Sequence, residues 1–288
     1  MSKISQNRFV RQVVYALERP SFGGRLSIDP DSLESVKTAN RAFLRTVDRW
    51  IADVDYENSI FQYGLPQRIR PLIDLPMTEE TSYSDMISCL ARAQGARLRY
   101  LEIGVSVGKN FAQVLQNSHD AELTAFDIES INPKLESMLA KETVTEWPTR
   151  SDSMRKTPST LSEYRHEANG NRVRYLAGDV FDPGAWERLK GQSFNLVFSD
   201  AFHSAEALVR EWDMLKKLDL LSHGGFVMLW DDLGGRDMRR AFYDVVEDMS
   251  RNHGLDKAKV GIRQYRGWVG ANEPYHPIGF IQMPGGWR

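Results

Sequence analysis

The sequence has 288 residues, with 37 Lys or Arg against 39 Asp or Glu, so its formal net charge at pH 7 is −2. This balance provides no general attraction to nucleic acid or to an anionic membrane, and the single cysteine, Cys89, excludes an internal disulfide and a Cys-based zinc cluster. The length suits one large α/β domain with an extension, and because no run of about 18 apolar residues occurs, we expect a soluble, cytoplasmic protein.

The first 77 residues show helical apolar spacing but no catalytic motif. Residues 7–17 and 31–54 are predicted as helices from the spacing of their apolar side chains. The proline-rich segment 56–76 is predicted to cross the surface without regular structure. We expect residues 1–77 to form a helical cap that covers a cleft, holds a partner subunit in a homo-oligomer, or only packs against the rest of the chain.

Residues 78–94 are predicted as a helix, and the segment 99–111 has the pattern of a strand, a Gly-rich turn and a second helix. An apolar run ends at Glu102, and Gly104 and Gly108 follow it. Glycine lets the backbone approach a ligand closely, and the turn leads to the positively polarised end of a helix. The segment therefore predicts a nucleotide-cofactor site, with a tight turn that binds no ligand as the alternative.

Acidic residues stand at the ends of the next two predicted strands. The strand 123–128 carries Asp127, 25 residues beyond Glu102, where a strand-end carboxylate can reach the ribose of a cofactor bound at the Gly-rich turn. The strand 172–180 carries Asp179, which either approaches the adenine end of the cofactor or caps the following turn.

The segment 131–171 between these two strands is longer than a single crossover helix requires. Their second half is polar and contains Pro148 and Pro158. We expect an inserted, lid-like loop that either faces the substrate or is disordered.

Two further apolar strands, 194–200 and 226–232, end in acidic residues and are each followed by a helix. The strand candidates 259–265 and 278–283 complete the chain. Strands that alternate with helices predict a parallel sheet covered on both faces. We therefore expect a Rossmann-like, doubly wound α/β domain over residues 78–288, with a mostly parallel sheet and a C-terminal antiparallel strand pair.

The tips of the strands 194–200 and 226–232 hold three aspartates, and a histidine follows the first by three residues. They are Asp200, Asp231, Asp232 and His203. Carboxylates brought close together repel one another, which raises their pKa values or calls for a cation, and oxygen ligands suit Mg²⁺, Mn²⁺ or Ca²⁺. A cation there would lower the pKa of a substrate hydroxyl, and His203 is the candidate general base. Helix capping is the alternative role of each aspartate, and a turn contact that of the histidine.

In this order, the motifs resemble the class I S-adenosylmethionine-dependent methyltransferases over residues 78–283. Within that class they are similar to the metal-dependent O-methyltransferases: the catechol type and, more closely, the macrocin and mycinamicin sugar O-methyltransferases of natural-product biosynthesis. The resemblance implies S-adenosyl-L-methionine as cofactor and Mg²⁺ or Mn²⁺ as metal. It implies cofactor contacts from Glu102, Gly104, Val105, Ser106, Gly108, Asn110, Asp127, Ile128, Asp179, Val180 and Asp200. It also implies metal ligation by Asp200, Asp231 and Asp232, and catalysis by His203 with Asp200.

The chain departs from the catechol-type pattern in two places. Those enzymes have Asn where this chain has Asp232, and they lack the histidine that matches His203, so the sugar-type comparison is the better one. Residues 1–77 and 131–171 match nothing in either type, and these are the parts that would choose the methyl acceptor.

We therefore expect an enzyme: an O-methyltransferase that acts on a hydroxyl of a small sugar, polyol or phenolic metabolite. One alternative is an NAD(P)-linked oxidoreductase that uses the same Gly-rich turn, although it lacks a Tyr-x-x-x-Lys pair and leaves Asp231 and Asp232 without a role. The other is a metal-independent or non-catalytic relative that binds the cofactor.

Overall fold

The computed structural model describes residues 24–47, 49–253, 259–270 and 275–285. The helix expected over residues 7–17 lies outside these ranges. None of the helices within them has the length and apolar character needed to cross a bilayer.

The described strands form one nine-stranded sheet in the order β3-β4-β5-β2-β1-β6-β7-β9-β8. The strands are β1 (Arg99–Ile103), β2 (Glu122–Asp127), β3 (Ala140–Trp147), β4 (Ser159–His166), β5 (Asn171–Ala177), β6 (Leu196–Ser199), β7 (Gly225–Trp230), β8 (Lys259–Arg266) and β9 (Tyr275–Pro284). The five central strands β5, β2, β1, β6 and β7 run parallel, whereas β9 and β8 form an antiparallel pair beyond β7. The expected doubly wound sheet and its C-terminal antiparallel pair are therefore confirmed.

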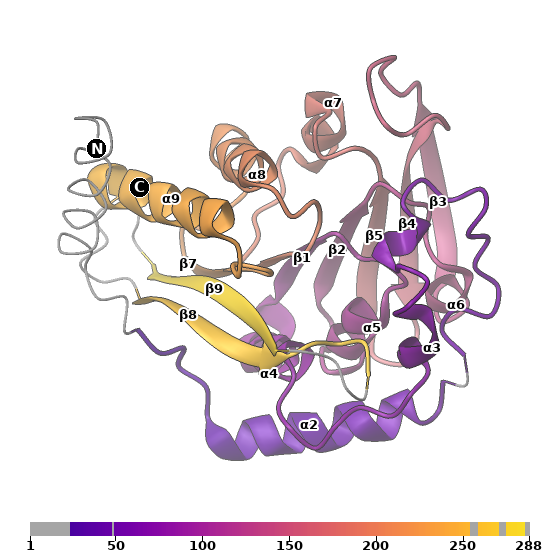
Figure 1. Cartoon of the computed structure of the whole chain (residues 1–288), viewed down its shortest axis with the longest axis horizontal. Helices are drawn as coiled ribbons and strands as arrows, with labels where there is room; N and C mark the ends of the chain where they lie inside the picture. Colours follow the sequence, from indigo (N-terminus) through magenta and orange to yellow (C-terminus); the bar gives the residue numbers. More distant parts are fainter. Residues whose placement is uncertain (1–23, 48, 254–258, 271–274, 286–288) are drawn as a thin grey trace, which may run out of the picture.

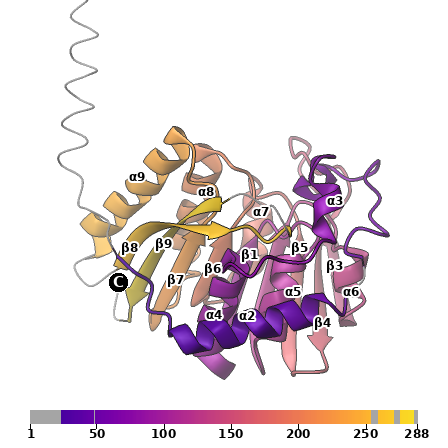
Figure 2. The ribbon, with the colours of Figure 1, turned by 60° about the horizontal axis from the view of Figure 1, so that its bottom comes forward.

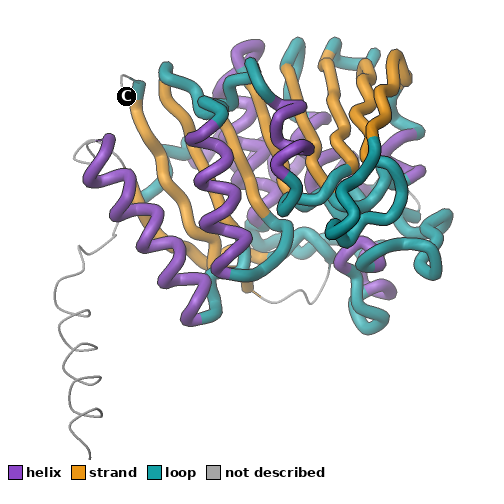
Figure 3. The backbone as a smooth tube through the Cα atoms, turned by 90° about the horizontal axis from the view of Figure 1, so that it is seen from above, coloured by secondary structure: helices purple, strands orange, loops and turns teal. Residues whose placement is uncertain are grey.

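Helices cover both faces of this sheet (Figure 1). They are α2 (Pro30–Leu44), α3 (Arg70–Ile73), α4 (Tyr83–Gln94), α5 (Lys109–Gln116), α6 (Pro133–Glu136), α7 (Pro183–Trp186), α8 (Ala205–Lys217) and α9 (Arg236–His253). Three 3-10 turns, η1 (Gln62–Gly64), η2 (Gly95–Arg97) and η3 (Glu187–Leu189), accompany them. Helices α4 and α5 pack on one face, and α7, α8 and α9 on the other, so the central strands are buried between two layers. Figure 3 shows the strands side by side as one continuous sheet.

Strand alternation divides the core into two clusters. In β1, Tyr100 belongs to the cluster under α4 and α5, whereas Leu101 and Ile103 belong to the cluster under α8 and α9. Successive side chains of a strand point to opposite faces, so Glu102 shares the face of Tyr100. This placement determines which side chains of the Gly-rich segment can reach a ligand.

The N-terminal segment packs against the α4–α5 layer through α2 (Figure 2). The buried guanidinium of Arg41 donates to both carboxylate oxygens of Asp85, at 2.9 and 2.8 Å. The expectation of one helix to residue 54 is wrong, because α2 ends at Leu44. The chain turns there, so that the Trp50 side chain enters the core. The backbone N–H of Trp50 donates to the Asp74 carboxylate.

The helix expected over 78–94 is shorter at its beginning, because Ser82 caps α4. The Ser82 side chain accepts from the Asp85 N–H while the Asp85 carboxylate accepts from the Ser82 N–H, which is a capping box. Gly95 ends the helix as expected.

The expectation that 131–171 is a loop is wrong for most of its length. After α6, strands β3 and β4 form an antiparallel hairpin, and β4 pairs with β5 and extends the sheet. Alternating burial along β4, which places Tyr164 in the core, explains why this segment joins the sheet. Between β3 and β4, residues 148–158 form a loop without helix or strand.

Candidate functional site

A cleft with a volume of about 790 Å³ lies at the carboxyl ends of the parallel strands. Open α/β sheets bind ligands at this edge, and the volume is in the range of small-molecule and cofactor sites. Its lining includes ten of the residues predicted for the site: Gly104, Ser106, Asp127, Ile128, Asp179, Val180, Asp200, His203, Asp231 and Asp232.

The Gly-rich turn approaches the neighbouring strand closely at Gly104. Its φ is +81°, and a Cβ there would lie 2.3 Å from the carbonyl oxygen of Asp200. Gly108, also at a φ of +81°, is the N-cap of α5, and a Cβ there would lie 2.6 Å from the side chain of Leu135. Both glycines are therefore required by backbone conformation and close packing, and Gly104 also presents its backbone to the cleft.

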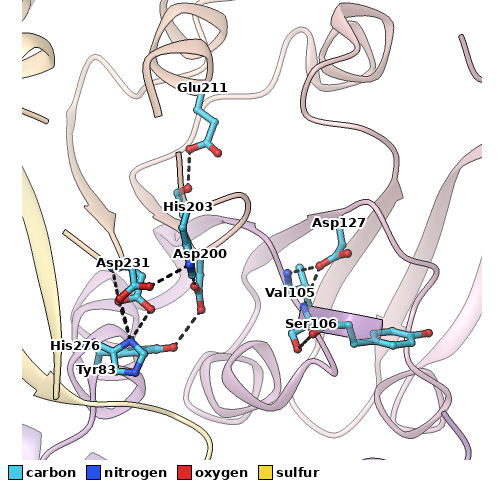
Figure 4. Close-up of polar contacts among 12 residues, drawn as sticks. Tyr83, Val105, Ser106, Asp127, Asp200, His203, Glu211, Asp231 and His276 are labelled. Atoms are coloured by element: carbon cyan, nitrogen blue, oxygen red, sulfur yellow. Dashed lines mark hydrogen bonds and ion pairs between the residues drawn. The ribbon is translucent and has the colours of Figure 1, made fainter. Parts of the chain in front are cut away.

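Asp127 holds the turn in place from the tip of β2. Its carboxylate accepts from the N–H groups of Val105 and Ser106 (Figure 4). It also accepts from the N–H of Glu129. Burial raises the pKa of Asp127 to about 6, against the opposing effect of these three hydrogen bonds. A carboxylate has about four acceptor positions, so Asp127 has room for one further donor from the cleft.

Four residues predicted to contact the cofactor do not line the cleft. They are Glu102, Val105, Gly108 and Asn110. Glu102 accepts from Tyr100 Oη at 2.7 Å and from Asn110 Nδ2 at 2.9 Å, beneath the turn. Strand alternation turns the Glu102 side chain toward α5, and burial raises its pKa to about 8. Glu102 and Asn110 therefore bond to one another behind the turn, and the cofactor contacts predicted for all four residues stay predictions.

Asp179 lines the cleft, and its carboxylate is hydrogen-bonded by groups of the protein itself. Its carboxylate accepts from Ser153 Oγ at 2.8 Å, from the Met154 N–H at 3.2 Å and from the Phe181 N–H at 2.9 Å. The first two donors belong to the loop 148–158, so Asp179 ties that loop to the edge of the cleft. It also stabilises the turn after β5, which is one of the two roles expected from the sequence.

The predicted catalytic cluster is assembled at the tips of β6 and β7. His203 contacts two of the aspartates, with Nε2 2.9 Å from Asp200 Oδ1 and Nδ1 3.1 Å from Asp232 Oδ2. Tyr83 Oη donates to the other oxygen of Asp200 at 3.1 Å. Figure 4 shows Asp200 beside Asp231, with His203 and Tyr83 around them.

His276 completes this cluster from β9. Its Nδ1 lies 2.9 and 3.1 Å from the two oxygens of Asp231 and 4.0 Å from an oxygen of Asp232. The Tyr83 ring meets the imidazole edge to face, with 5.6 Å between ring centroids. Neither Tyr83 nor His276 was predicted as a site residue. Tyr83 begins a helix, His276 precedes the segment predicted as the last strand, and the two are far apart in the sequence.

The charges of the cluster are unevenly distributed. Burial and, next, the charge of Asp200 raise the pKa of Asp231 above its ordinary range. Burial alone would lower the pKa of His203, but its hydrogen bonds with Asp200 and Asp232 outweigh that effect and raise it to about 11. His203 therefore occupies a position where positive charge is favoured.

The donor set fits a divalent cation. Two sets of three potential ligand atoms each lie within 4.8 Å of one another. One set comes from Asp200, His203 and Asp231, and the other from Asp231, Asp232 and His276. Carboxylate oxygens suit Mg²⁺ and Mn²⁺, and imidazole nitrogen favours the transition ions.

The N-terminal segment supplies one wall of the cleft through residues 61–65, here called the strap. The Glu129 carboxylate accepts from the backbone N–H of Phe61 at 2.7 Å and from the backbone N–H of Ile60 at 3.1 Å. Ser106 Oγ donates to the carbonyl of Tyr63, which joins the strap to the Gly-rich turn. No local pattern in the sequence predicted this contact. Glu129 was not singled out, because the nearby Asp127 was the acid expected to bind ribose.

No protein-family model and no curated protein matches this chain. Among solved structures, it is similar to a putative O-methyltransferase from Klebsiella pneumoniae, with 12% identity, 96% of each chain covered and a TM-score of 0.46. An O-methyltransferase from Bacillus cereus in complex with SAH has 14% identity, 95% of this chain and 96% of that chain covered, and a TM-score of 0.45. The O-methyltransferase TomG from Streptomyces achromogenes, involved in tomaymycin synthesis and in complex with SAM, has 17% identity, 90% and 93% covered, and a TM-score of 0.47. Identities and TM-scores this low assign no activity to the chain.

Proposed function

We propose that this chain is an S-adenosylmethionine-dependent O-methyltransferase that uses Mg²⁺ or Mn²⁺ and acts on a hydroxyl of a small sugar, polyol or phenolic metabolite. One observation carries the proposal: a single cleft joins the Gly104 turn and Asp127 to the cluster of Asp200, His203 and Asp231. A cofactor cradle and an acid–base group thus face the same space.

The cofactor end of the cleft is assigned to the Gly-rich turn and the strand tips beside it. Gly104 and Ser106 present backbone to the ligand, and Asp127 offers its remaining acceptor position to a ribose hydroxyl. The loop tied to Asp179 closes the edge of the cleft where the adenine would lie.

The acceptor end is assigned to the cluster around His203. When bound, S-adenosylmethionine supplies an activated methyl group, and a divalent cation supplies positive charge that lowers the proton affinity of His203 and of a nearby hydroxyl. His203 takes the hydroxyl proton at Nδ1 in place of its contact with Asp232, while Asp200 orients the imidazole through Nε2 and Tyr83 holds Asp200. Phe202 and Phe61, about half-exposed at the cleft, shield the acceptor from water.

The experiment is a calorimetric titration of S-adenosylhomocysteine into the full chain, followed by Mg²⁺ or Mn²⁺ into the saturated protein. We expect saturable binding in both steps. Asp127→Asn keeps an acceptor for the turn but removes the charge, and should weaken the first step about 10- to 100-fold, the value of one charge-assisted hydrogen bond. Asp200→Asn should weaken the second step, whereas Asp219→Asn, an exposed aspartate outside the cleft, should change neither.

Each rival has its own outcome. A folded protein that binds NADH and not S-adenosylhomocysteine would replace the proposal with the oxidoreductase. Cofactor binding without cation binding would favour the metal-independent relative, in which His203 and His276 alone neutralise the acids. Natural-product biosynthesis, a homo-oligomeric state and a cytoplasmic location stay predictions.

A further inference from the structure

The position of His276 relative to the acids is set by the main chain. Strand β9 pairs antiparallel with β7, with Gly279 opposite Trp230, the last residue of β7. The N–H of Leu233 donates to the carbonyl of Pro277 at 3.0 Å, which ties the turn that carries Asp231 and Asp232 to the residue after His276. The imidazole is therefore held against the acids by backbone hydrogen bonds on both sides of the turn.

Close packing supports the same placement. A Cβ at Gly279 would lie 2.2 Å from the Leu233 side chain, so β9 and the turn after β7 are in direct contact. The Tyr83 ring also packs edge to face against the His276 imidazole. Only 19% of the His276 side chain is exposed, against 57% for His223 at the surface.

The atoms that converge here form a mixed ligand set. Oxygens of Asp231 and Asp232 and Nδ1 of His276 can all lie within 4.8 Å of one another, and Asp231 is buried. A buried carboxylate needs a positive partner, which a shared cation would provide in place of the present hydrogen bond to the imidazole.

We propose that His276 is a direct ligand, through Nδ1, of the divalent cation held by Asp231 and Asp232, and that this nitrogen makes the site prefer Mn²⁺ to Mg²⁺. Imidazole nitrogen binds first-row transition ions better than it binds Mg²⁺, which strongly favours oxygen ligands and water. The inference rests on the cation site of the proposed function. It adds a ligand from the antiparallel part of the sheet, whereas the acids come from the parallel part.

The test uses Mn²⁺ as the probe on the full chain saturated with S-adenosylhomocysteine. Pulsed electron paramagnetic resonance detects hyperfine coupling between Mn²⁺ and a directly bound ¹⁴N. We expect this coupling in the wild type and in His203→Gln and His223→Gln, and its loss in His276→Gln. Calorimetry should show Mn²⁺ affinity reduced at least about tenfold in His276→Gln, with a change of less than about threefold for Mg²⁺.

The contrary results are distinct. Bound Mn²⁺ without ¹⁴N coupling in the wild type, or coupling that persists in His276→Gln, would overturn the inference and leave the cation site standing. Cofactor binding without any Mn²⁺ binding would overturn both the inference and the cation part of the proposed function. Circular dichroism of each variant verifies folding, and His276→Asn replaces His276→Gln if the latter does not fold.

Discussion

Gly104 stands at a φ of +81°, and a Cβ there would lie 2.3 Å from the Asp200 carbonyl oxygen. Gly191 has nearly the same φ, +84°, but open space around its Cα. The two positions separate the cost of the backbone conformation from the cost of the close approach. At Gly104, both costs act on the turn that faces the cleft.

We expect Gly191→Ala to lower the free energy of unfolding by about 1–2 kcal/mol, the cost of a left-handed conformation for a residue with a Cβ. Gly104→Ala should cost more than this and should also weaken S-adenosylhomocysteine binding, because the turn must move away from Asp200. Urea denaturation and calorimetry measure the two effects. Equal losses of stability in the two variants would show that the turn tolerates the extra atom.

Glu211 is a buried acid behind the cluster. Its carboxylate accepts from Ser199 Oγ at 2.6 Å, and burial raises its pKa to about 7 from an ordinary value of 4.5. Because the folded state holds the proton more tightly, this group's contribution to stability is fully present below pH 4.5 and is lost as the pH rises through 7.

Glu211→Gln should therefore stabilise the protein relative to wild type above pH 7, by about 3 kcal/mol from the size of the pKa shift, and should give no such gain near pH 4.5. Urea denaturation of both proteins across this pH range measures the difference. A difference that does not vary with pH would contradict the buried titration.

Helix α2 is joined to helix α4 by a buried ion pair. Arg41 donates to both Asp85 oxygens and also to the carbonyls of Thr78 and Glu80. The same Asp85 closes the capping box with Ser82. One carboxylate thus sets both the beginning of α4 and the docking of the N-terminal segment.

Arg41→Ala should lower the free energy of unfolding by about 3–5 kcal/mol, because it leaves the Asp85 charge buried without its partner. The matched control is Arg251→Ala, which breaks an exposed pair with Glu247 on α9 and should cost at most about 1 kcal/mol. Thermal and urea unfolding measure both variants. Similar costs would mean that the Arg41 pair is no more important than a surface pair.

Burial differs strongly between the middle of the nine-stranded sheet and its β3 edge. Strand β1 lies between β2 and β6, and four of its five residues are buried. Strand β3 lies at the sheet edge, and seven of its eight residues are exposed. The middle of the sheet therefore carries the site, and its edge carries little of the core.

We expect amide hydrogen exchange to be slowest in β1 and its neighbours and much faster in β3, because edge strands open without breaking the core. Mass spectrometry of peptic peptides measures this. Equal protection of β3 and β1 would indicate that a partner covers the edge, as a homo-oligomer would.

The parallel strands, the acids at their tips and the Gly-rich turn could all be predicted from the sequence. Apolar runs, glycines and strand-end acids are local signals, and the carboxyl ends of parallel strands necessarily meet at one edge. That is why Asp127, Asp200, Asp231 and Asp232 were correctly placed at a common cleft. Their roles as cofactor and metal ligands stay predictions.

Which side chains surround those acids depends on how distant segments pack together. Strand alternation places the Glu102 side chain beneath the turn, where it accepts from Tyr100. The segment 131–171, expected to be a loop, instead forms β3 and β4, and β4 pairs with β5. Tyr83, Glu129 and His276 reach the site through contacts between segments far apart in the chain. Such contacts depend on how helices and strands pack, and local sequence patterns carry no information about a partner that only packing brings near.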